Sequence, residues 1–523
     1  MIGDVKRGVT GWALWGLPVV SGALLGLAFP PFPHTSGLAW IALVPLFFFL
    51  RRASLRGAVF GGLLFSSVFN LISMAWMSIF GWPAYLGLSI LLAGSLAIPY
   101  FLWLKVLGGE EPRRYFVWGP ATWMVYEYAH TLGYWAFPWG NIAHTQWGLL
   151  PVVQTAAWTG VYGVAFLIVF VNSGTYVLLE AALKGRVRAA WPLAALPIAL
   201  TLAAAGMGAV RMRATFAGEP ITVGVAQDKE KTEATWTDEK RRAVLDEYEA
   251  VLAPHRQEGI DLMVLPESFA EDYDYPKPDD PQCPQASLGL ALAHWLKNAS
   301  YVLAYGAEGV DHVCDAKQQA YNSFFLRDGK GIRGRIDKRR LVPFGEYVPL
   351  RVAITKIFPQ YPWGGTDLGA GSAVELLPFQ LPGCDGKGCE RPMGALICFE
   401  TLFPQDSRDM ARKGARLLVS GTNSSWFRPW ATEQMIRFEV YRPVEEGLYF
   451  ARAGTGGIST IIDPAGRFLV RLPPFVAAEG HAKVNLRTAD TFYARHGDWL
   501  VWLAAALALG LTTLKWAAPR EVP

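Results

Sequence analysis

The apolar residues of this chain form long runs near its beginning and at its end, and shorter runs between them. A run of about 20 apolar residues is long enough to cross a bilayer as a helix. Eight spanning segments are predicted, at Gly11–Phe29, Gly37–Leu50, Gly57–Met77, Ala84–Leu107, Phe116–Tyr134, Leu150–Leu183, Ala190–Val210 and Trp499–Leu514. The second run is shorter than the others, and Glu127 and His130 interrupt the fifth.

Between about Thr215 and His496 the pattern changes to short apolar runs that have the length of buried strands. These runs are ITVGVAQ, DLMVLPE, YVLAYGAEGV, YNSFFLRDG, MGALICFE, RLLVSGTN and GISTIID. Stretches with helical spacing separate some of them, and IIDPAGRFLVRL has the pattern of a hairpin. We therefore predict a helical membrane domain over 1–214, a layered α/β domain over 215–496, and a last spanning helix with a short tail over 497–523.

Composition agrees with this division. The chain has 523 residues, which is too long for one ordinary domain, and 52% of them are hydrophobic. Residues 1–210 carry only 11 basic and 5 acidic side chains, out of 48 and 44 in the whole chain. The net charge is +4 and no dense stripe of Lys or Arg appears, which argues against a nucleic-acid partner.

Basic residues cluster in every second gap between the apolar runs. They lie before the first run and after the second, fourth, sixth and eighth, while the gaps after the first, third and fifth hold no Lys or Arg. The positive-inside rule then places both termini in the cytoplasm and the α/β domain on the opposite face, the periplasmic side of a bacterial inner membrane. A cleaved signal peptide is the alternative, but no small-residue cleavage site stands out and further apolar runs follow at once.

Three reactive side chains stand near the ends of predicted strands. Glu267 ends DLMVLPE, Lys338 follows GIRGRID, and Cys398 lies in MGALICFE. A carboxylate can remove a thiol proton, the thiolate can attack a carbonyl, and a lysine cation can stabilise the oxyanion. A helix that begins near Pro404 could lower the thiol pKa through its dipole. Taken singly, each residue is more often structural: a packed thiol, a turn carboxylate or a solvated lysine.

The ordered set resembles the Glu-Lys-Cys triad of the nitrilase, or carbon–nitrogen hydrolase, superfamily, which implies an αββα sandwich. Longer sequence motifs resemble one narrower family within this superfamily. KRRLVPFGEYVPL, which begins at Lys338, resembles the lysine motif of the apolipoprotein N-acyltransferase family. ICFETLFP is similar to the cysteine motif of that family, and AFPWGNIAHTQ to its Phe-Pro-Trp loop. The resemblance covers nearly the whole chain, including the eight predicted membrane segments.

The resemblance implies a two-step acyl transfer without metal or cofactor, and the sequence shows no convincing metal-ligand spacing. Cys398 would take an acyl chain from a phospholipid as a thioester, with Glu267 as base and Lys338 as oxyanion stabiliser. The acceptor would be the α-amine of the S-diacylglyceryl-cysteine at a lipoprotein N-terminus. Supporting or substrate-binding roles are expected for five further residues, Glu346, Glu400, Phe399, Trp236 and Trp426.

Some positions depart from the pattern of the family. Phe399 stands where tyrosine is common, and SGTNSSWFRP, which contains Trp426, matches only loosely. His130 stands where arginine is expected, three residues after Glu127. We interpret Glu127 and His130 as a buried polar brace, with a headgroup site as the alternative, because ionisable groups in membrane segments often mark function.

The other four cysteines also lie in the predicted α/β domain, where a periplasmic location would permit disulfides. Cys384 and Cys389 flank the turn-like DGKG and are the first pair expected, and Cys283 with Cys314 is the second. Cys398 is then left unpaired, as a nucleophile must be. The alternative is that all five cysteines are reduced.

Two other functions stay open. A membrane-tethered nitrilase-type amidase would use the same triad to hydrolyse a small amide, with water as the acceptor. A scaffold protein with an inactive nitrilase-like domain would not need an intact triad. The Phe-Pro-Trp loop and the whole-chain match favour the acyltransferase.

Overall fold

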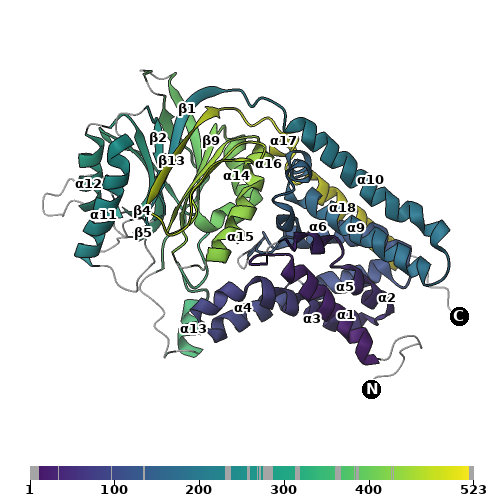
Figure 1. Cartoon of the computed structure of the whole chain (residues 1–523). Coiled ribbons are helices and arrows are strands. Elements are labelled where there is room, and N and C mark those ends of the chain that lie inside the picture. Colours follow the sequence, from purple (N-terminus) through teal and green to yellow (C-terminus); the bar gives the residue numbers. More distant parts are fainter. Residues whose placement is uncertain are drawn as a thin grey trace. The chain divides into compact units, whose positions relative to one another are not determined.

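The computed structural model describes most of the chain between residues 11 and 517. The residues outside this description are 1–10, 33, 96, 134–135, 230–236, 256–258, 268, 270–272, 275–286, 298, 312–318, 358, 360–366, 382, 385–387, 426, 428 and 518–523. The chain divides into two compact units (Figure 1). The helical unit comprises Met1–Ala214, Glu433–Tyr441 and His496–Pro523, and the α/β unit comprises Thr215–Thr432 and Arg442–Arg495.

The helical unit is built from the apolar runs. Its elements, with 3₁₀ helices labelled η, are α1 (Gly11–Leu27), η1 (Ser36–Trp40), α2 (Val44–Arg52), α3 (Leu55–Ser73), η2 (Ala75–Phe80), α4 (Trp82–Ser95), α5 (Ala97–Gly108), α6 (Pro112–Ala129), η3 (Ile142–Gln146), α7 (Leu150–Val153), α8 (Ala156–Thr159), α9 (Val161–Ala182), α10 (Val187–Arg211) and α18 (Trp499–Ala517). In the described chain, four stretches are long and apolar enough to cross a membrane: Leu55–Ser73, Trp82–Gly108, Val161–Ala182 and Val187–Arg211. The protein is therefore a membrane protein with several candidate spans.

Two predicted runs differ from the helices that form. The run Leu150–Leu183 begins as the one-turn helices α7 and α8, and the long helix starts only at Val161. Gly160, between them, has φ +67°, which lies outside the right-handed helical region and interrupts the run. The run Gly37–Leu50 becomes η1, a turn and the nine-residue α2. A nine-residue helix is only about 14 Å long, so α2 alone does not have the length of a span.

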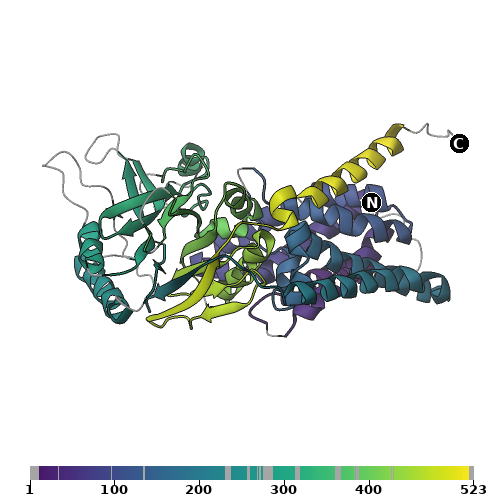
Figure 2. The same ribbon diagram turned by 90° about the horizontal axis from the view of Figure 1, so that it is seen from above.

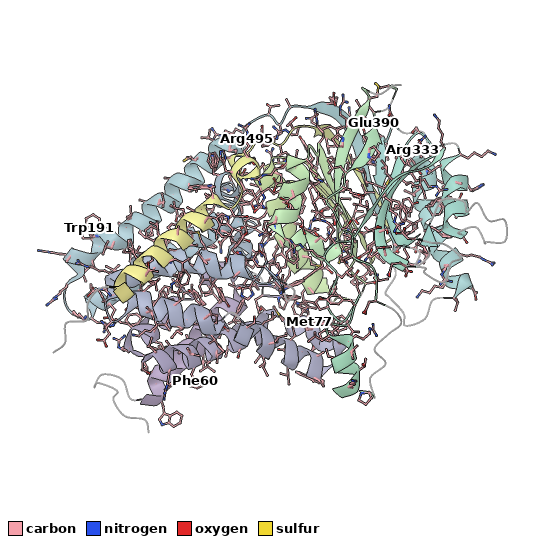
Figure 3. All side chains as sticks on the ribbon, turned by 180° about the vertical axis from the view of Figure 1, so that it is seen from behind. Phe60, Met77, Trp191, Arg333, Glu390 and Arg495 are labelled. Atoms are coloured by element: carbon pink, nitrogen blue, oxygen red, sulfur yellow. A yellow bond between two sulfur atoms is a disulfide. The ribbon has the colours of Figure 1, made fainter. Side chains whose placement is uncertain are left out.

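Apolar side chains cover the outside of these helices. Phe60 on α3 is 63% exposed and Trp191 on α10 is 58% exposed. Both side chains point away from the helices in Figure 3. Soluble proteins rarely expose large contiguous apolar surfaces, so this outer surface suits contact with lipid.

Charged residues at or just after the ends of three apolar runs meet within the helical unit. Glu180, near the end of α9, lies 3.4 Å from Arg51, 2.9 Å from Arg52 and 3.8 Å from Lys184. Lys105, near the end of α5, donates to the backbone carbonyl of Arg51 at 3.0 Å. The C-terminal ends of α2, α5 and α9 therefore lie at the same end of the helical unit.

The α/β unit contains short strands and amphipathic helices. Its strands are β1 (Glu219–Gln227), β2 (Leu262–Val264), β3 (Tyr273–Asp274), β4 (Val302–Asp311), β5 (Gln319–Asp328), β6 (Gly331–Asp337), β7 (Leu377–Gln380), β8 (Glu390–Ile397), β9 (Leu417–Asn423), β10 (Phe450–Thr455), β11 (Thr460–Ile462), β12 (Phe468–Arg471) and β13 (Ala478–Leu486). Its helices are α11 (Asp238–Leu252), η4 (Ala253–His255), α12 (Ser287–Leu296), α13 (Arg351–Ile357), η5 (Cys398–Leu402), α14 (Pro404–Arg412), α16 (Tyr441–Glu446) and α17 (Phe492–His496). Helix α15 (Pro429–Glu439) begins in this unit and continues into the helical one.

Two mixed sheets pack face to face in the α/β unit (Figures 1 and 2). Among the described residues, the first sheet has the order β13-β1-β2-β4-β5-β6, with β3 paired to β4, and the second has the order β12-β11-β10-β9-β8-β7. Strands β1, β2 and β4 are parallel, as are β8, β9 and β10. Helices α11 and α12 cover the outer face of the first sheet, and α14 packs beside β8 of the second. The result is an α/β sandwich.

The predicted strands all appear, and β11 and β12 form the predicted hairpin, with Ile461 opposite Val470. Four of the described strands were not predicted: the short β3 and the edge strand β13 of the first sheet, and β7 and β10 of the second. Parallel strands carry their carboxyl ends to a common edge, which is where side chains of a site are usually assembled.

Candidate active site

The three side chains predicted to react lie together inside the α/β unit. Glu267 follows β2, Lys338 follows β6, and Cys398 begins η5 directly after β8. Their exposed fractions are 5%, 1% and 9%. A turn carboxylate or a solvated lysine would be largely exposed, so the surface interpretation of Glu267 and Lys338 is excluded.

Lys338 is the cation at the centre of the cluster. Its Nζ lies 3.1 Å from Glu267 Oε1 and 2.8 Å from Glu346 Oε1. Its backbone N–H donates to the carbonyl of Asn322 at 2.8 Å, which fixes the start of the lysine loop to β5. Burial alone would lower the pKa of the Lys338 ammonium, but the charges of Glu267 and Glu346 raise the pKa well above its usual range. Lys338 therefore remains charged.

Glu267 is held by donors from separate segments. Asn322 Nδ2 donates to its Oε1 at 2.6 Å, and the backbone N–H of Asn423 donates to its Oε2 at 2.8 Å. Burial acts to raise the pKa of the Glu267 carboxyl, but Lys338 and these hydrogen bonds outweigh burial and hold the pKa below its usual range. Glu267 is therefore ionised and fixed in orientation, as a general base must be.

The two sheets approach closely beside this carboxylate. A Cβ placed on Gly421 of β9 would lie 2.9 Å from the backbone N of Glu267 and 2.5 Å from the ring of Phe324. These distances are too short for a real side chain. Glycine at this position lets β9 pass beside Glu267 and brings the N–H of Asn423 within reach of its carboxylate.

Among the described cysteines, Cys398 is free and buried. Its thiol shares a hydrogen bond with Glu267. Burial and the charge of Glu267 raise the pKa of the thiol well above its usual range, although Lys338 acts in the opposite direction. The net pKa of the thiol is therefore raised and not lowered as expected from the helix that begins at Pro404, because burial and the adjacent Glu267 carboxylate both act to raise it. The thiol is protonated at rest, and Glu267 is the acceptor for its proton.

Cys398 also has an uncommon backbone conformation. Its φ of +49° lies in the left-handed region, which residues with a side chain rarely adopt. The turn arises because β8 ends at Ile397 and η5 begins with the next residue. Thr401 Oγ1 donates to the Cys398 carbonyl at 2.9 Å and closes the turn. Such conformations cost about 1–3 kcal/mol and are concentrated at functional sites.

Glu400 joins the cysteine turn to the lysine loop. Its Oε2 accepts the backbone N–H of Ile397 at 2.9 Å. Its Oε1 accepts the backbone N–H groups of Arg339 at 2.8 Å and Arg340 at 3.2 Å. These donors are the residue before the reactive cysteine and the two residues after the lysine, so one buried carboxylate fixes both segments. Burial and the charge of Asp406 raise the pKa of the Glu400 carboxyl.

Asn322 belongs to the cluster although sequence analysis did not identify it. Its Nδ2 donates to Glu267 Oε1 and to Glu346 Oε1, both at 2.6 Å. Glu346 also accepts the backbone N–H of Val342 on Oε2 at 2.7 Å, which closes the lysine loop. The available signal was a polar amide within the apolar run YNSFFLRDG.

The aromatic positions are only partly described. Phe399 is buried, and its ring packs edge-on against Phe403 with centroids 5.2 Å apart. Trp236 and Trp426 lie outside the described residues, so their predicted roles stay predictions.

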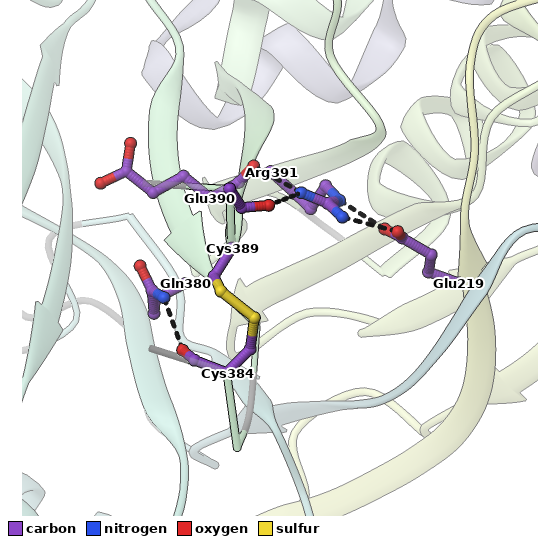
Figure 4. Close-up of a disulfide and its surroundings, with 7 residues drawn as sticks. Glu219, Gln380, Cys384, Cys389, Glu390 and Arg391 are labelled. Carbon is purple, nitrogen blue, oxygen red and sulfur yellow. Dashed lines mark hydrogen bonds and ion pairs between the residues drawn. A yellow bond between two sulfur atoms is a disulfide. The ribbon is translucent and has the colours of Figure 1, made fainter. Parts of the chain in front are cut away.

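A disulfide joins Cys384 to Cys389, with Cα atoms 5.6 Å apart (Figure 4). The first predicted pairing is confirmed. Gln380 Nε2 donates to the carbonyl of Cys384 at 2.7 Å, so the bridge and this hydrogen bond close the turn between β7 and β8. Cys283 and Cys314 lie outside the described residues.

The Phe-Pro-Trp loop is fixed within the helical unit. Trp139 Nε1 donates to Gln434 Oε1 at 2.7 Å, and Gln434 belongs to the segment Glu433–Tyr441 of the same unit. Gln434 Nε2 donates in turn to the carbonyls of Pro30 and Ser73 at 2.9 and 3.1 Å. One buried amide therefore joins the loop to two other segments.

Glu127 and His130 make separate contacts in the helical unit. Glu127 Oε1 accepts the backbone N–H of Ile142 at 2.7 Å, at the start of η3. The His130 ring packs edge-on against Tyr126, with centroids 4.8 Å apart. Glu127 therefore braces the loop that follows α6.

Known proteins resemble the chain over nearly its whole length. The family described as "Apolipoprotein N-acyltransferase N-terminal domain" matches residues 21–174, and the family "Carbon-nitrogen hydrolase" matches residues 222–490. The apolipoprotein N-acyltransferase of Geobacter metallireducens is 32% identical over 95% of this chain and 94% of its own. The apolipoprotein N-acyltransferase of Gloeobacter violaceus is 30% identical over 94% of this chain and 92% of its own.

Among solved structures, Saccharomyces cerevisiae Nit3, a member of branch 10 of the nitrilase superfamily, is 16% identical, with a TM-score of 0.39 over 54% of this chain and 97% of its own. The family matches and the full-length relatives decide the assignment. The chain belongs to the apolipoprotein N-acyltransferase family, and its α/β unit is a carbon–nitrogen hydrolase domain.

Proposed function

We propose that this chain is an apolipoprotein N-acyltransferase that works through a thioacyl intermediate on Cys398. It takes an acyl chain from a phospholipid and transfers it to the α-amine of the S-diacylglyceryl-cysteine at a lipoprotein N-terminus. The observation that carries the proposal is the buried cluster in which the Glu267 carboxylate contacts both the Cys398 thiol and the Lys338 ammonium. The full-length relatives bear the name of this activity.

In the first step Glu267 takes the thiol proton and the Cys398 sulfur attacks the ester carbonyl carbon of the phospholipid. The Lys338 cation stabilises the oxyanion that forms. The ester C–O bond then breaks, and the released alkoxide takes the proton from Glu267 and leaves as a lysophospholipid. The resting protonation states suit this step, because Glu267 is ionised and can accept a proton while Cys398 carries one. The transfer is uphill at rest, so it is coupled to the attack of the sulfur on the carbonyl.

In the second step the lipoprotein amine attacks the thioester carbonyl. The C–N bond forms, the C–S bond breaks, and the amine proton returns to the sulfur through Glu267. The triad is then restored without any other reactant, as a covalent mechanism in two half-reactions requires. The left-handed backbone of Cys398 supports this role, because it gives the sulfur a position that an ordinary strand end does not provide.

The positions around the triad have supporting roles in this proposal. Glu346 balances the charge of Lys338, and Glu400 sets the distance between the lysine loop and the cysteine turn. Phe399, Trp236 and Trp426 are assigned to substrate contact on the basis of their motif positions. The mechanism uses no metal ion or cofactor.

We assign residues 1–214 to a membrane domain with seven spanning helices, 215–496 to a periplasmic catalytic domain, and 497–523 to the eighth helix and a cytoplasmic tail. The charged ends of α2, α5 and α9 support this topology, because Arg51, Lys105 and Lys184, which lie at or just after the ends of predicted runs that point to the cytoplasm, meet at one end of the helical unit. The disulfide between Cys384 and Cys389 suits an oxidising periplasm. The membrane in this assignment is the inner membrane of a bacterium. Embedding in it brings the enzyme to a phospholipid donor and a lipoprotein acceptor whose acyl chains lie in the same bilayer.

The test is an acceptor competition with the purified full-length protein in phospholipid nanodiscs. One reaction contains an S-diacylglyceryl-cysteinyl peptide with a free α-amine, and the matched control contains the same peptide with an acetylated amine. We expect an N-acyl peptide only in the first reaction. A membrane-tethered amidase would instead hydrolyse small amides and leave both peptides unmodified, which would overturn the proposal.

A further inference from the structure

Three side chains that can ligate a metal meet in the α/β unit, apart from the triad. His255 ends η4, and Glu479 and His481 lie two residues apart on β13. One ligand atom from each side chain lies within 4.8 Å of the other two. Sequence spacing did not reveal this group, because His255 is distant in the chain from the other two residues.

The group lies on the helix-covered face of the first sheet. Residues two apart on a strand share a face, so Glu479 and His481 point to the same side. Glu479 pairs with Ala226 on β1, and Ala226 belongs to the apolar core beneath α11. Glu267, by contrast, is bonded to β9 of the second sheet. The group and the triad are therefore on opposite sides of the first sheet.

Glu479 lies between the two imidazoles. Its Oε2 is 3.2 Å from His255 Nε2, and its Oε1 is 3.0 Å from His481 Nδ1. The side chain of Glu479 is only 7% exposed, while those of His255 and His481 are 20% and 44% exposed. The carboxylate is thus buried, and the two imidazoles are partly open to solvent.

The structural interpretation of this group is a pair of hydrogen bonds between histidines and a carboxylate. The donor set, however, is that of zinc and its neighbours, since imidazole nitrogens with one carboxylate oxygen suit these ions, whereas Mg²⁺ and Ca²⁺ prefer oxygen ligands alone. Ligands of a tetrahedral zinc ion lie about 3.3 Å apart. Each imidazole lies close to this distance from a different oxygen of Glu479, and one ligand atom from each of the three residues lies within 4.8 Å of the other two, so small side-chain rotations would bring the three atoms around one ion.

We propose that His255, Glu479 and His481 bind one divalent transition-metal ion of the zinc class, with water in the fourth position. The ion would join the segment after α11 to the edge strand β13. Because it lies across the sheet from the triad, its role is to stabilise the α/β unit and not to take part in acyl transfer. An ion that binds only the folded state stabilises that state by mass action.

The test uses untagged full-length protein in detergent, stripped with EDTA and transferred to metal-free buffer. Zn²⁺ is titrated against a chromophoric chelator, and Co²⁺ is used in parallel because its visible absorption reports the ligands. The variants are His481→Ala and Glu479→Gln, and the matched control is His294→Ala, which removes an exposed histidine on α12. All variants are checked for wild-type far-UV circular dichroism in EDTA.

We expect one ion per chain with micromolar or tighter affinity in the wild type and in His294→Ala, and binding at least tenfold weaker in the two site variants. The Co²⁺ spectrum should lack the thiolate charge-transfer band that a cysteine site would give. Zn²⁺ should raise the midpoint of thermal unfolding in the wild type and not in the site variants. Absence of saturable binding, or equal binding in all variants, would overturn the proposal.

Discussion

Glu400 Oε1 accepts the backbone N–H of Arg339 at 2.8 Å, while Oε2 of the same carboxylate accepts an N–H from the residue before the nucleophile. One side chain therefore sets the separation of two loops that come from different sheets. The lysine loop follows β6 of the first sheet, and the cysteine turn follows β8 of the second. Lys338 and Cys398, the proposed oxyanion stabiliser and nucleophile, are held in register by backbone contacts as well as by their own side chains.

Substitution Glu400→Gln should disturb this register although it preserves shape. An amide offers one acceptor oxygen, so its NH₂ group would face a backbone N–H on one of the two sides. A buried donor left without a partner costs about 1–3 kcal/mol, which corresponds to roughly a ten- to hundredfold slower acylation if the full cost appears in the transition state. Glu390→Gln, an exposed position at the start of β8, is the matched control and should acylate at the wild-type rate.

A positioning role for Glu400 differs from a purely structural one in its kinetic signature. The acylation rate constant should fall in protein that is still folded at the assay temperature, while the apparent affinity for phospholipid changes little. Equal losses in the acylation rate constant and in the apparent affinity for phospholipid would contradict a positioning role for Glu400. An acylation rate equal to that of Glu390→Gln would also contradict it.

The pH dependence of acylation should follow the depressed pKa of Glu267. An ordinary glutamate has a pKa of about 4.3, and that of Glu267 lies below its usual range. The base therefore stays ionised down through this region, and the acylation rate should be constant from neutral pH to about pH 5. The stabilisation that Glu267 contributes is likewise present above its unfolded pKa and is lost as the pH falls through the folded pKa. Single-turnover acylation rates measured across this pH range check the prediction. An acylation rate that already falls as the pH drops just below neutrality would argue against Glu267 as the base.

Substitution Gly421→Ala should weaken both the fold and the catalytic base. The added methyl group would meet the backbone of Glu267 and the ring of Phe324, so one of the sheets must shift. Overpacking of this kind costs about 1–3 kcal/mol, and the shift should lengthen the hydrogen bond from Asn423 to Glu267. Denaturant unfolding and acylation rates would show both effects. Gly388→Ala is the control, because a Cβ at Gly388 would meet nothing within 4 Å.

Removal of the disulfide should reduce stability without abolishing the chemistry. The bridge between Cys384 and Cys389 closes a short loop, for which loop entropy predicts a loss of about 2 kcal/mol. The double variant Cys384→Ser/Cys389→Ser should unfold at lower denaturant concentration and still form the acyl adduct, because Cys398 is free in the wild type. Loss of the adduct in a folded double variant would show that the bridge shapes the site itself.

The sequence could predict that Glu267, Lys338 and Cys398 lie together, because each stands near the end of a predicted strand. Strand ends converge in a layered fold, so three separate motifs were enough to predict one cluster. The same logic could not find Asn322 or Gly421. Their importance depends on which strands of two different sheets face each other, and that pairing has no local signal in the chain.

Two of the strands that the sequence did not predict lack the apolar pattern of a buried strand. Strand β10 carries Arg452, which is fully buried, so the segment has no continuous apolar run. Strand β13 is an edge strand with intermediate and exposed positions, and it contains Glu479 and His481. The local sequence around Cys398 could not predict the pKa of its thiol, because this pKa depends on burial and on Glu267, which follows a strand of the other sheet.

The most direct test of the central claim is the intact mass of the purified protein after incubation with phospholipid alone, beside a Cys398→Ala control. The mechanism predicts a mass increase of one acyl chain that hydroxylamine removes and that the control lacks. A folded wild-type protein that gains no adduct, or a control that gains the same adduct, would contradict a thioester at Cys398.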